Sequence, residues 1–141
     1  MYQKFFGSLE HKRDGDKVEL KAVLENLAFN EDGLVPVITQ DASTKNVLMM
    51  AWMNKEAIEK TLETRKVTYW SRSRQSFWVK GESSGHTQAL CEMYFDCDGD
   101  SILCIAEQVG PACHTLRPNC FYLKADQESQ VVHVIGDGYQ S

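Results

Sequence analysis

The spacing of apolar residues predicts a helix near the amino terminus. Between Asp16 and Asn30 these residues recur at steps of three and four, which places them on one face of a helix. Gly33 follows as a stop signal. We therefore predict an amphipathic helix over residues 16–30, with its apolar face formed by Leu20, Val23, Leu24 and Leu27.

Two short apolar runs and a second helical pattern come next. Residues 35–40 and 47–53 favour strands and are separated by a polar stretch, 41–46, which predicts a hairpin. Asn54 then offers an N-cap, and one apolar face continues as far as Arg65. The residues predicted on that face are Ala57, Ile58, Thr61 and Leu62.

After Lys66 the pattern changes to short β-favouring segments divided by Gly, Ser, Asp and Pro. No internal repeat or interdomain linker interrupts them. The sequence therefore predicts one α+β domain over residues 1–141, with a mainly antiparallel sheet and a few helices. The predicted strands are 67–70, 77–79, 88–95, 102–107 and 120–123, followed by a strand and a glycine-containing tail within 131–141.

Composition and charge narrow the class of protein. The chain has 141 residues, 43% of them hydrophobic, which suits one domain with one core. The net charge is −5, so long-range attraction to nucleic acid or to an anionic membrane is not expected. Residues 1–13 lack an apolar stretch of signal-peptide length, and no run approaches the roughly 20 residues of a membrane span. We expect a cytoplasmic protein.

Three of the five cysteines suggest a zinc site. Cys97, Cys113 and Cys120 lie 16 and then 7 residues apart, so no CxxC pair exists. Three widely spaced thiolates suit a catalytic zinc that keeps one position for water and lowers the pKa of that water toward ~7. His114 is either a fourth ligand or a proton-transfer group. The alternative is that all five cysteines are buried small hydrophobes, and we expect this of Cys91 and Cys104.

Three alternating aspartates suggest a second, harder metal. In an extended backbone Asp96, Asp98 and Asp100 would point one way and Cys97 the other. Oxygen-only ligands suit Mg²⁺ or Ca²⁺, so one segment would serve a hard and a soft metal on opposite faces. An EF-hand does not fit, because Ser101 occupies the position that requires glycine. A solvated acidic turn is the alternative.

A basic and aromatic stretch offers an anion-binding surface. Residues 65–80 contain five cations and no acid in a chain that is acidic overall. If the strand from Val67 continues, Trp70, Arg72 and Arg74 share one face, as a base and a phosphate would require. The alternatives are a surface for single-stranded nucleic acid and an ordinary sheet with solvated arginines. The candidate substrate-binding residues are Trp70, Arg72, Arg74, Trp78, Lys80 and Ser83.

Seven short segments fall in order between about residues 30 and 122: GLVPV (33–37), MAWMN (50–54), YWSRSR (69–74), WVKGESSG (78–85), DCDGD (96–100), GPACHT (110–115) and CFY (120–122). Together they resemble the phosphoribosyl-AMP cyclohydrolase family of histidine biosynthesis, in its monofunctional form. Leu116 stands where that family usually has glycine, and Pro118-Asn119 stand where a serine is common before the cysteine.

The resemblance implies an intertwined homodimer in which Cys97 reaches the zinc of the partner subunit, while Cys113 and Cys120 complete the site. It also implies magnesium at Asp96, Asp98 and Asp100, and 1-(5-phosphoribosyl)-AMP as the substrate. A zinc-bound hydroxide would then attack C6 and open the adenine ring at N1–C6. His114 would move the proton as the catalytic acid–base group.

Three other classes compete with this interpretation. Zinc deaminases attack the same ring, but their H-x-E and P-C-x-x-C signatures are absent here. A zinc-stabilised nucleic-acid-binding module would unfold without zinc and would bind with strong salt dependence. A calcium-binding domain would be indifferent to loss of Cys113 and Cys120.

Overall fold

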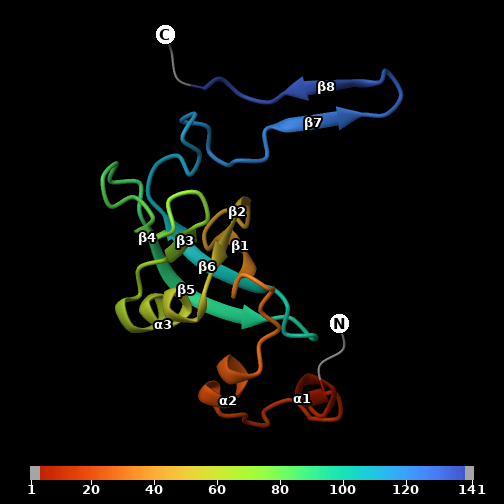
Figure 1. Cartoon of the computed structure of the whole chain (residues 1–141). Helices are drawn as coiled ribbons and strands as arrows, with labels where there is room; N and C mark the ends of the chain where they lie inside the picture. Colours follow the sequence, from red (N-terminus) through yellow and green to blue (C-terminus); the bar gives the residue numbers. More distant parts are fainter. Residues whose placement is uncertain (1–3, 139–141) are drawn as a thin grey trace.

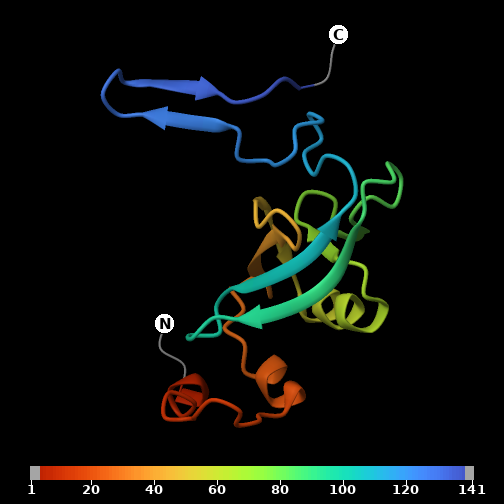
Figure 2. The same ribbon diagram turned by 180° about the vertical axis from the view of Figure 1, so that it is seen from behind.

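A computed structural model describes residues 4–138 as short helices around several small sheets (Figures 1 and 2). Within those residues, no helix has both the length and the apolar character needed to cross a membrane. The helices are α1 (Lys4–Gly7), α2 (Leu20–Glu25) and α3 (Lys55–Thr64). The strands are β1 (Val35–Asp41), β2 (Val47–Met53), β3 (Thr68–Ser71), β4 (Ser76–Val79), β5 (Gln88–Phe95), β6 (Ile102–Gln108), β7 (Leu123–Asp126) and β8 (Val131–Val134).

The central sheet has four strands in the order β2-β1-β6-β5. β1 pairs with β2 and β5 pairs with β6 as antiparallel hairpins, while β1 and β6 run parallel. β3 with β4 and β7 with β8 form two further antiparallel pairs. The predicted α+β class with mainly antiparallel pairing is confirmed. The parallel seam between β1 and β6 was not predicted.

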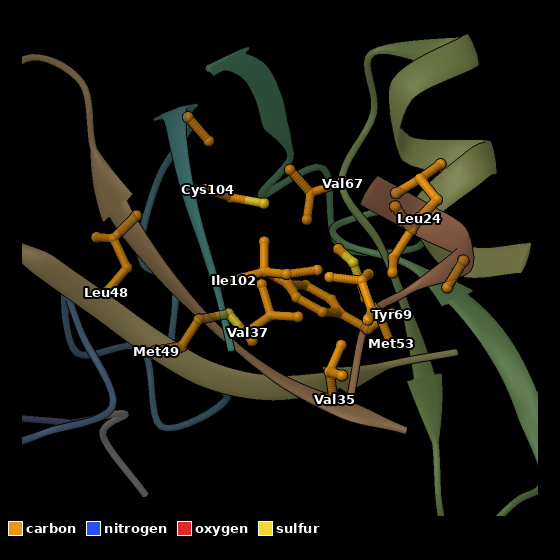
Figure 3. Packing of buried hydrophobic residues seen from close by; sticks show 14 of the residues in the cluster. Leu24, Val35, Val37, Leu48, Met49, Met53, Val67, Tyr69, Ile102 and Cys104 are labelled. Carbon is orange, nitrogen blue, oxygen red and sulfur yellow. The ribbon is translucent and has the colours of Figure 1, made fainter. Parts of the chain in front are cut away.

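One core lies between the inner face of this sheet, α3, α2 and the β3–β4 hairpin (Figure 3). Alternate residues of β1 and β6 are buried there, among them Val35, Val37 and Cys104. Tyr69 is fully buried, and its hydroxyl is hydrogen bonded to Thr39 (2.7 Å) and Gln88 (2.6 Å). Because a buried hydroxyl needs such partners, this contact fixes β3 against the sheet and so positions the β3–β4 hairpin.

The two predicted helices differ in outcome. α3 is confirmed: Asn54 Oδ1 accepts a hydrogen bond from the Ala57 amide at 2.8 Å, and Arg65 ends the helix in the left-handed conformation. The helix predicted over 16–30 is wrong in extent, because only Leu20–Glu25 is helical. Glu19, at its N-cap, makes no side-chain capping bond, so nothing stabilises an earlier start.

The strand predicted at 120–123 is also misplaced. Residues 120–122 are irregular and β7 begins at Leu123. The β7–β8 hairpin lies away from the central sheet in both views (Figures 1 and 2). Its apolar side chains Leu123, Val132 and Val134 are exposed.

Candidate active site

Two of the three predicted zinc thiols lie together in the loop between β6 and β7. Cys113 and Cys120 lie close enough for each to shift the pKa of the other, and the Thr115 hydroxyl donates to Cys113 Sγ at 3.1 Å. The backbone amide of Cys120 donates to the Leu48 carbonyl at 2.8 Å. The loop is therefore anchored on β2, which brings residues seven positions apart to one place.

The electrostatics of this pair favour one thiolate. Partial burial raises the pKa of Cys113, but hydrogen bonds from Thr115 outweigh it, so the pKa lies below its usual value. Burial, reinforced by the neighbouring Cys113, raises the pKa of Cys120 to about 11. Lys80 lies beside both thiols, donating from Nζ to the Ala112 carbonyl at 2.7 Å. A cation next to two soft donors favours their deprotonation, which a metal would require.

The structure also has an aromatic groove, and Lys80 lies between one of its tryptophans, Trp78, and the thiol loop. The groove encloses about 640 Å³ between β2 and the β3–β4 hairpin. Trp70 and Arg72 line it, as does Trp78, whose ring lies 5.9 Å from Lys80 Nζ. Trp52 also lines the groove, with the Arg72 guanidinium 4.8 Å from its ring. The groove can therefore hold a flat ring and an anion.

Sequence reasoning gave Trp52 no role. It stands within the MAWMN segment on β2, and its ring faces Arg72 in the turn between β3 and β4. The sequence could have indicated this role, because Trp52 is a tryptophan on the solvent side of a predicted strand and the basic stretch 65–80 follows it in the chain.

Three of the predicted substrate-binding residues, Arg74, Lys80 and Ser83, do not line this groove. β3 ends at Ser71, so Arg72 and Arg74 both lie in the hairpin turn and the expectation that they share a strand face with Trp70 is wrong, although Arg72 still lines the groove. Arg74 is in the hairpin turn, where its Nε donates to Ser71 Oγ at 3.3 Å. Ser83 is exposed in the turn that follows Lys80.

The acidic segment, residues 96–100, forms a turn between β5 and β6, which we call the acidic turn. Ligand atoms of Asp96, Cys97 and Asp98 all lie within 4.8 Å of one another. The expectation that Cys97 points away from the carboxylates is therefore wrong, because it assumed an extended backbone. The Asp100 amide donates to Asp96 Oδ1 at 2.9 Å.

The carboxylates of this turn interact with one another. Partial burial raises the pKa of Asp96, but backbone hydrogen bonds from Asp100 and Asp98 outweigh it, so its pKa lies below the usual value. A hydrogen bond with Asp96 raises the pKa of Asp100. The turn therefore concentrates negative charge, which a cation would neutralise.

The acidic turn and the thiol pair lie at opposite ends of β6. The turn precedes Ile102 and the thiol loop follows Gln108 (Figure 1). Since a strand rises about 3.3 Å per residue, the two ends are separated by about 20 Å. Within one chain, Cys97 therefore does not meet Cys113 and Cys120.

Comparison with known proteins decides the family. A sequence model described as phosphoribosyl-AMP cyclohydrolase matches residues 49–122. The chain is 52% identical over 120 residues to a phosphoribosyl-AMP cyclohydrolase of Hydrogenovibrio crunogenus, covering 85% of this chain and 82% of that protein. The chain belongs to the phosphoribosyl-AMP cyclohydrolase family. It is an enzyme of the hydrolase class.

Other cyclohydrolases agree with this assignment. The chain is 63% identical over 98 residues to one from Ruegeria sp., covering 70% of this chain and 76% of that protein. It is 54% identical over 121 residues to one from Alkalilimnicola ehrlichii, covering 86% and 85%. The matched stretch contains the thiol loop, the acidic turn and most of the aromatic groove.

The two remaining cysteines, Cys104 and Cys91, differ in burial. Cys104 is buried in β6, as expected of a core residue, and burial raises its pKa to about 12. Cys91 is exposed, so its predicted burial is wrong. An irregularity in the pairing of β5 with β6 occurs between Leu90 and Glu92, which turns the intervening residue outward.

His114 is exposed in the turn after Cys113, and Leu116 follows with a left-handed φ of 71°. The position where the family resemblance led us to expect glycine thus has the conformation that favours glycine. A left-handed non-glycine residue costs roughly 1–2 kcal/mol.

We predict that Leu116→Gly stabilises the protein. Relief of the left-handed strain exceeds the added entropy of the unfolded chain, leaving a gain of about 0.5–1 kcal/mol in the free energy of unfolding. Chemical denaturation monitored by circular dichroism measures this. Leu123→Gly, at an exposed leucine within β7, is the control and should destabilise. A loss of stability in Leu116→Gly would contradict the strain argument.

Proposed function

We propose that this chain hydrolyses 1-(5-phosphoribosyl)-AMP, opening the adenine ring at N1–C6 to give the formimino-aminoimidazole carboxamide ribonucleotide of histidine biosynthesis. The observation that carries the proposal is the aromatic groove beside a pair of thiols. Lys80 connects the two, lying against Trp78 on one side and the Cys113 loop on the other. The family to which the chain belongs supports the same reaction.

Cys113 and Cys120 would hold zinc, with Cys97 of a second copy as the third ligand. Their donor chemistry fits the metal: two soft sulfur atoms lie close enough to shift each other's pKa, and the pKa of Cys113 is lowered. When bound, zinc would supply an activated water as the nucleophile by lowering the pKa of that water to about 7. Thr115 would keep Cys113 oriented and deprotonated, while Cys120, whose pKa is raised, would lose its proton when the metal binds beside Lys80.

Asp96, Asp98 and Asp100 would hold magnesium. Their carboxylates are hard oxygen donors on one turn, and the lowered pKa of Asp96 keeps that group ionised. The backbone bond from Asp100 to Asp96 leaves the second Asp96 oxygen free of that interaction. Charge neutralisation by the cation would relieve the repulsion within the turn.

The chain's own side chains would orient the substrate. Trp70 or Trp78 would stack on the adenine ring, while Arg72 and Lys80 would contact phosphate. Arg74 and Ser83 would contribute only at the rim, since both are exposed outside the groove. His114, next to Cys113, would accept the proton from water and deliver it to the ring nitrogen as the N1–C6 bond breaks.

A homodimer is supported by the outer face of the central sheet. Met50, Ile38, Leu103 and Tyr94 are direct neighbours across β2, β1, β6 and β5, so they form one apolar row. Ile38, Met50 and Tyr94 are exposed. A second copy related by a two-fold axis that crosses the strands reverses β6 and brings its acidic turn to the thiol pair. The same packing would cover the row and complete the zinc ligands.

We predict that Ile38→Asp dissociates this dimer. A carboxylate placed in the row would be buried without a partner, at a cost of roughly 3–5 kcal/mol. The dimer dissociation constant should rise by about 100-fold or more, measured by sedimentation. Leu20→Asp, at an exposed leucine that begins α2, is the matched control and should leave the dimer intact. A fully dimeric Ile38→Asp protein would exclude this face.

The decisive test is hydrolysis of phosphoribosyl-AMP by purified, metal-analysed protein, followed by the absorbance of the ring-opened product with and without a zinc chelator. Zinc-dependent turnover supports the proposal. No turnover in folded, zinc-loaded protein would contradict it. The basic aromatic hairpin would then be tested as a surface for single-stranded nucleic acid.

A further inference from the structure

We propose that the amino-terminal segment, residues 4–28, positions the acidic turn, and that Phe6 is the positioning residue. The inference rests on the proposed function, in which side chains of this turn hold metal. The segment precedes the stretch matched by the family model, which begins at residue 49. Figure 1 shows α1 and α2 beside the end of the sheet where β5 leads into β6.

Gly99 is the point of contact between the segment and the turn. It is buried and has a left-handed φ of 68°. A Cβ added there would lie 2.1 Å from the Phe6 ring, so the ring occupies the space that any other residue would need. On the backbone side, the Ala28 amide donates to the Gly99 carbonyl at 2.8 Å. Two residues of the segment, Phe6 and Ala28, therefore contact Gly99 and hold it in place.

Gly99 in turn sets the positions of the neighbouring ligands. Its amide donates to the Asp96 carbonyl at 3.0 Å, and the Asp100 amide donates to the Asp96 carboxylate. Without a cation, the clustered carboxylates repel one another and would spread a free turn apart. A turn held at its centre keeps the ligands in place before the cation arrives, and such preorganisation increases affinity.

Phe6 also forms part of an apolar wall behind the ligands. A cavity of about 320 Å³ lies between the segment and the turn; on the side of the segment it is lined by four apolar side chains, Phe6, Leu9, Val18 and Val23, and by Glu10. Phe6 itself is buried. An apolar wall on one side of charged ligands limits their solvation and strengthens their interaction with a cation.

Phe6→Ala tests the inference because it removes the ring without removing any ligand. In the metal-free full-length protein, the amides of Gly99 and Asp100 should exchange faster with solvent, as measured by NMR. Mg²⁺ titrated calorimetrically should bind about 10-fold more weakly, since loss of a supporting group outside the ligands typically costs 10–100-fold in metal affinity. Phe5→Ala, which deletes the neighbouring ring of α1, is the control and should change both quantities less.

The two readouts separate the inference from the proposed function. If the wild-type protein binds no Mg²⁺, the magnesium assignment fails, while the exchange rates still test the support of the turn. Unchanged exchange at Gly99 and Asp100 in folded Phe6→Ala would overturn the inference. Should that variant fail to fold, Phe6→Leu replaces it, with the same amides expected to exchange faster.

A double substitution tests the contact directly. Gly99→Ala should weaken Mg²⁺ binding strongly in the wild-type background, because the added methyl group meets the Phe6 ring. In the Phe6→Ala background the same change should cost less, leaving only the left-handed strain. Equal losses of affinity in the two backgrounds would show that the ring and Gly99 act independently, and would overturn the inference.

Discussion

Cys113→Ala is expected to lose zinc and turnover together, with kcat/KM falling to the level of the uncatalysed reaction. The substitution removes the thiol whose pKa is lowered and leaves Cys120 without its neighbour, so too few soft donors remain. Metal analysis of the purified protein, with phosphoribosyl-AMP turnover on the same sample, measures both losses. Cys120→Ala should behave in the same way.

Cys91→Ala is the matched control for these variants. Its thiol is exposed on β5, outside the Cys113 loop, so zinc content and turnover should remain at wild-type levels. Full activity in a zinc-free Cys113→Ala protein would contradict the proposed role of zinc.

His114→Asn is expected to retain zinc and to slow turnover by roughly 10²–10⁴-fold, the usual contribution of a positioned acid–base group. Asparagine preserves hydrogen bonding but cannot act as an acid–base group. The side chain is exposed and follows Cys113 in the chain. The measurement is kcat over a range of pH in zinc-loaded protein.

The variant should also lose the pH dependence that the imidazole imposes on kcat. His133→Asn is the control: His133 is exposed on β8 and pairs with Asp126 at 3.3 Å. It should leave the pH profile unchanged. A wild-type rate and profile in His114→Asn would remove this residue from the mechanism.

Local chemistry made part of the fold predictable. The Asn54 cap, the apolar face of α3 and the polar turn between β1 and β2 are each specified by adjacent residues. Each was therefore predicted close to its observed boundaries. The segment from Asp16 to Asn30 has helical periodicity but no side-chain cap, and only its central turns form. Periodicity alone did not define its length.

Long-range placement could not be predicted from spacing. The pairing of β1 with β6 depends on two hairpins meeting, which no local pattern records. The acidic residues were assigned to extended backbone, whereas Gly99 with its positive φ makes a turn. Cys97 therefore lies beside Asp96 and Asp98 and not on the opposite face from them.

The residue types of the candidate site could be predicted from the sequence better than their arrangement in space. Cys113 and Cys120 were expected to act together, and they lie close enough for each to shift the pKa of the other. Trp70, Arg72 and Trp78 share a groove as a substrate site would need, but Arg74 does not, because the hairpin turn directs it to Ser71. The residue types indicated the reaction, and the turns determined which of them can cooperate.

The parallel seam between β1 and β6 has a consequence for how the chain folds. Each antiparallel hairpin can form from neighbouring residues, but Val37 meets Ile102 only after nearly half the chain has been enclosed. Closing so long a loop is entropically costly and slow. We expect the β1–β2 and β5–β6 hairpins to appear early and their docking to limit the folding rate. Substitutions at the seam should then slow folding more than they accelerate unfolding.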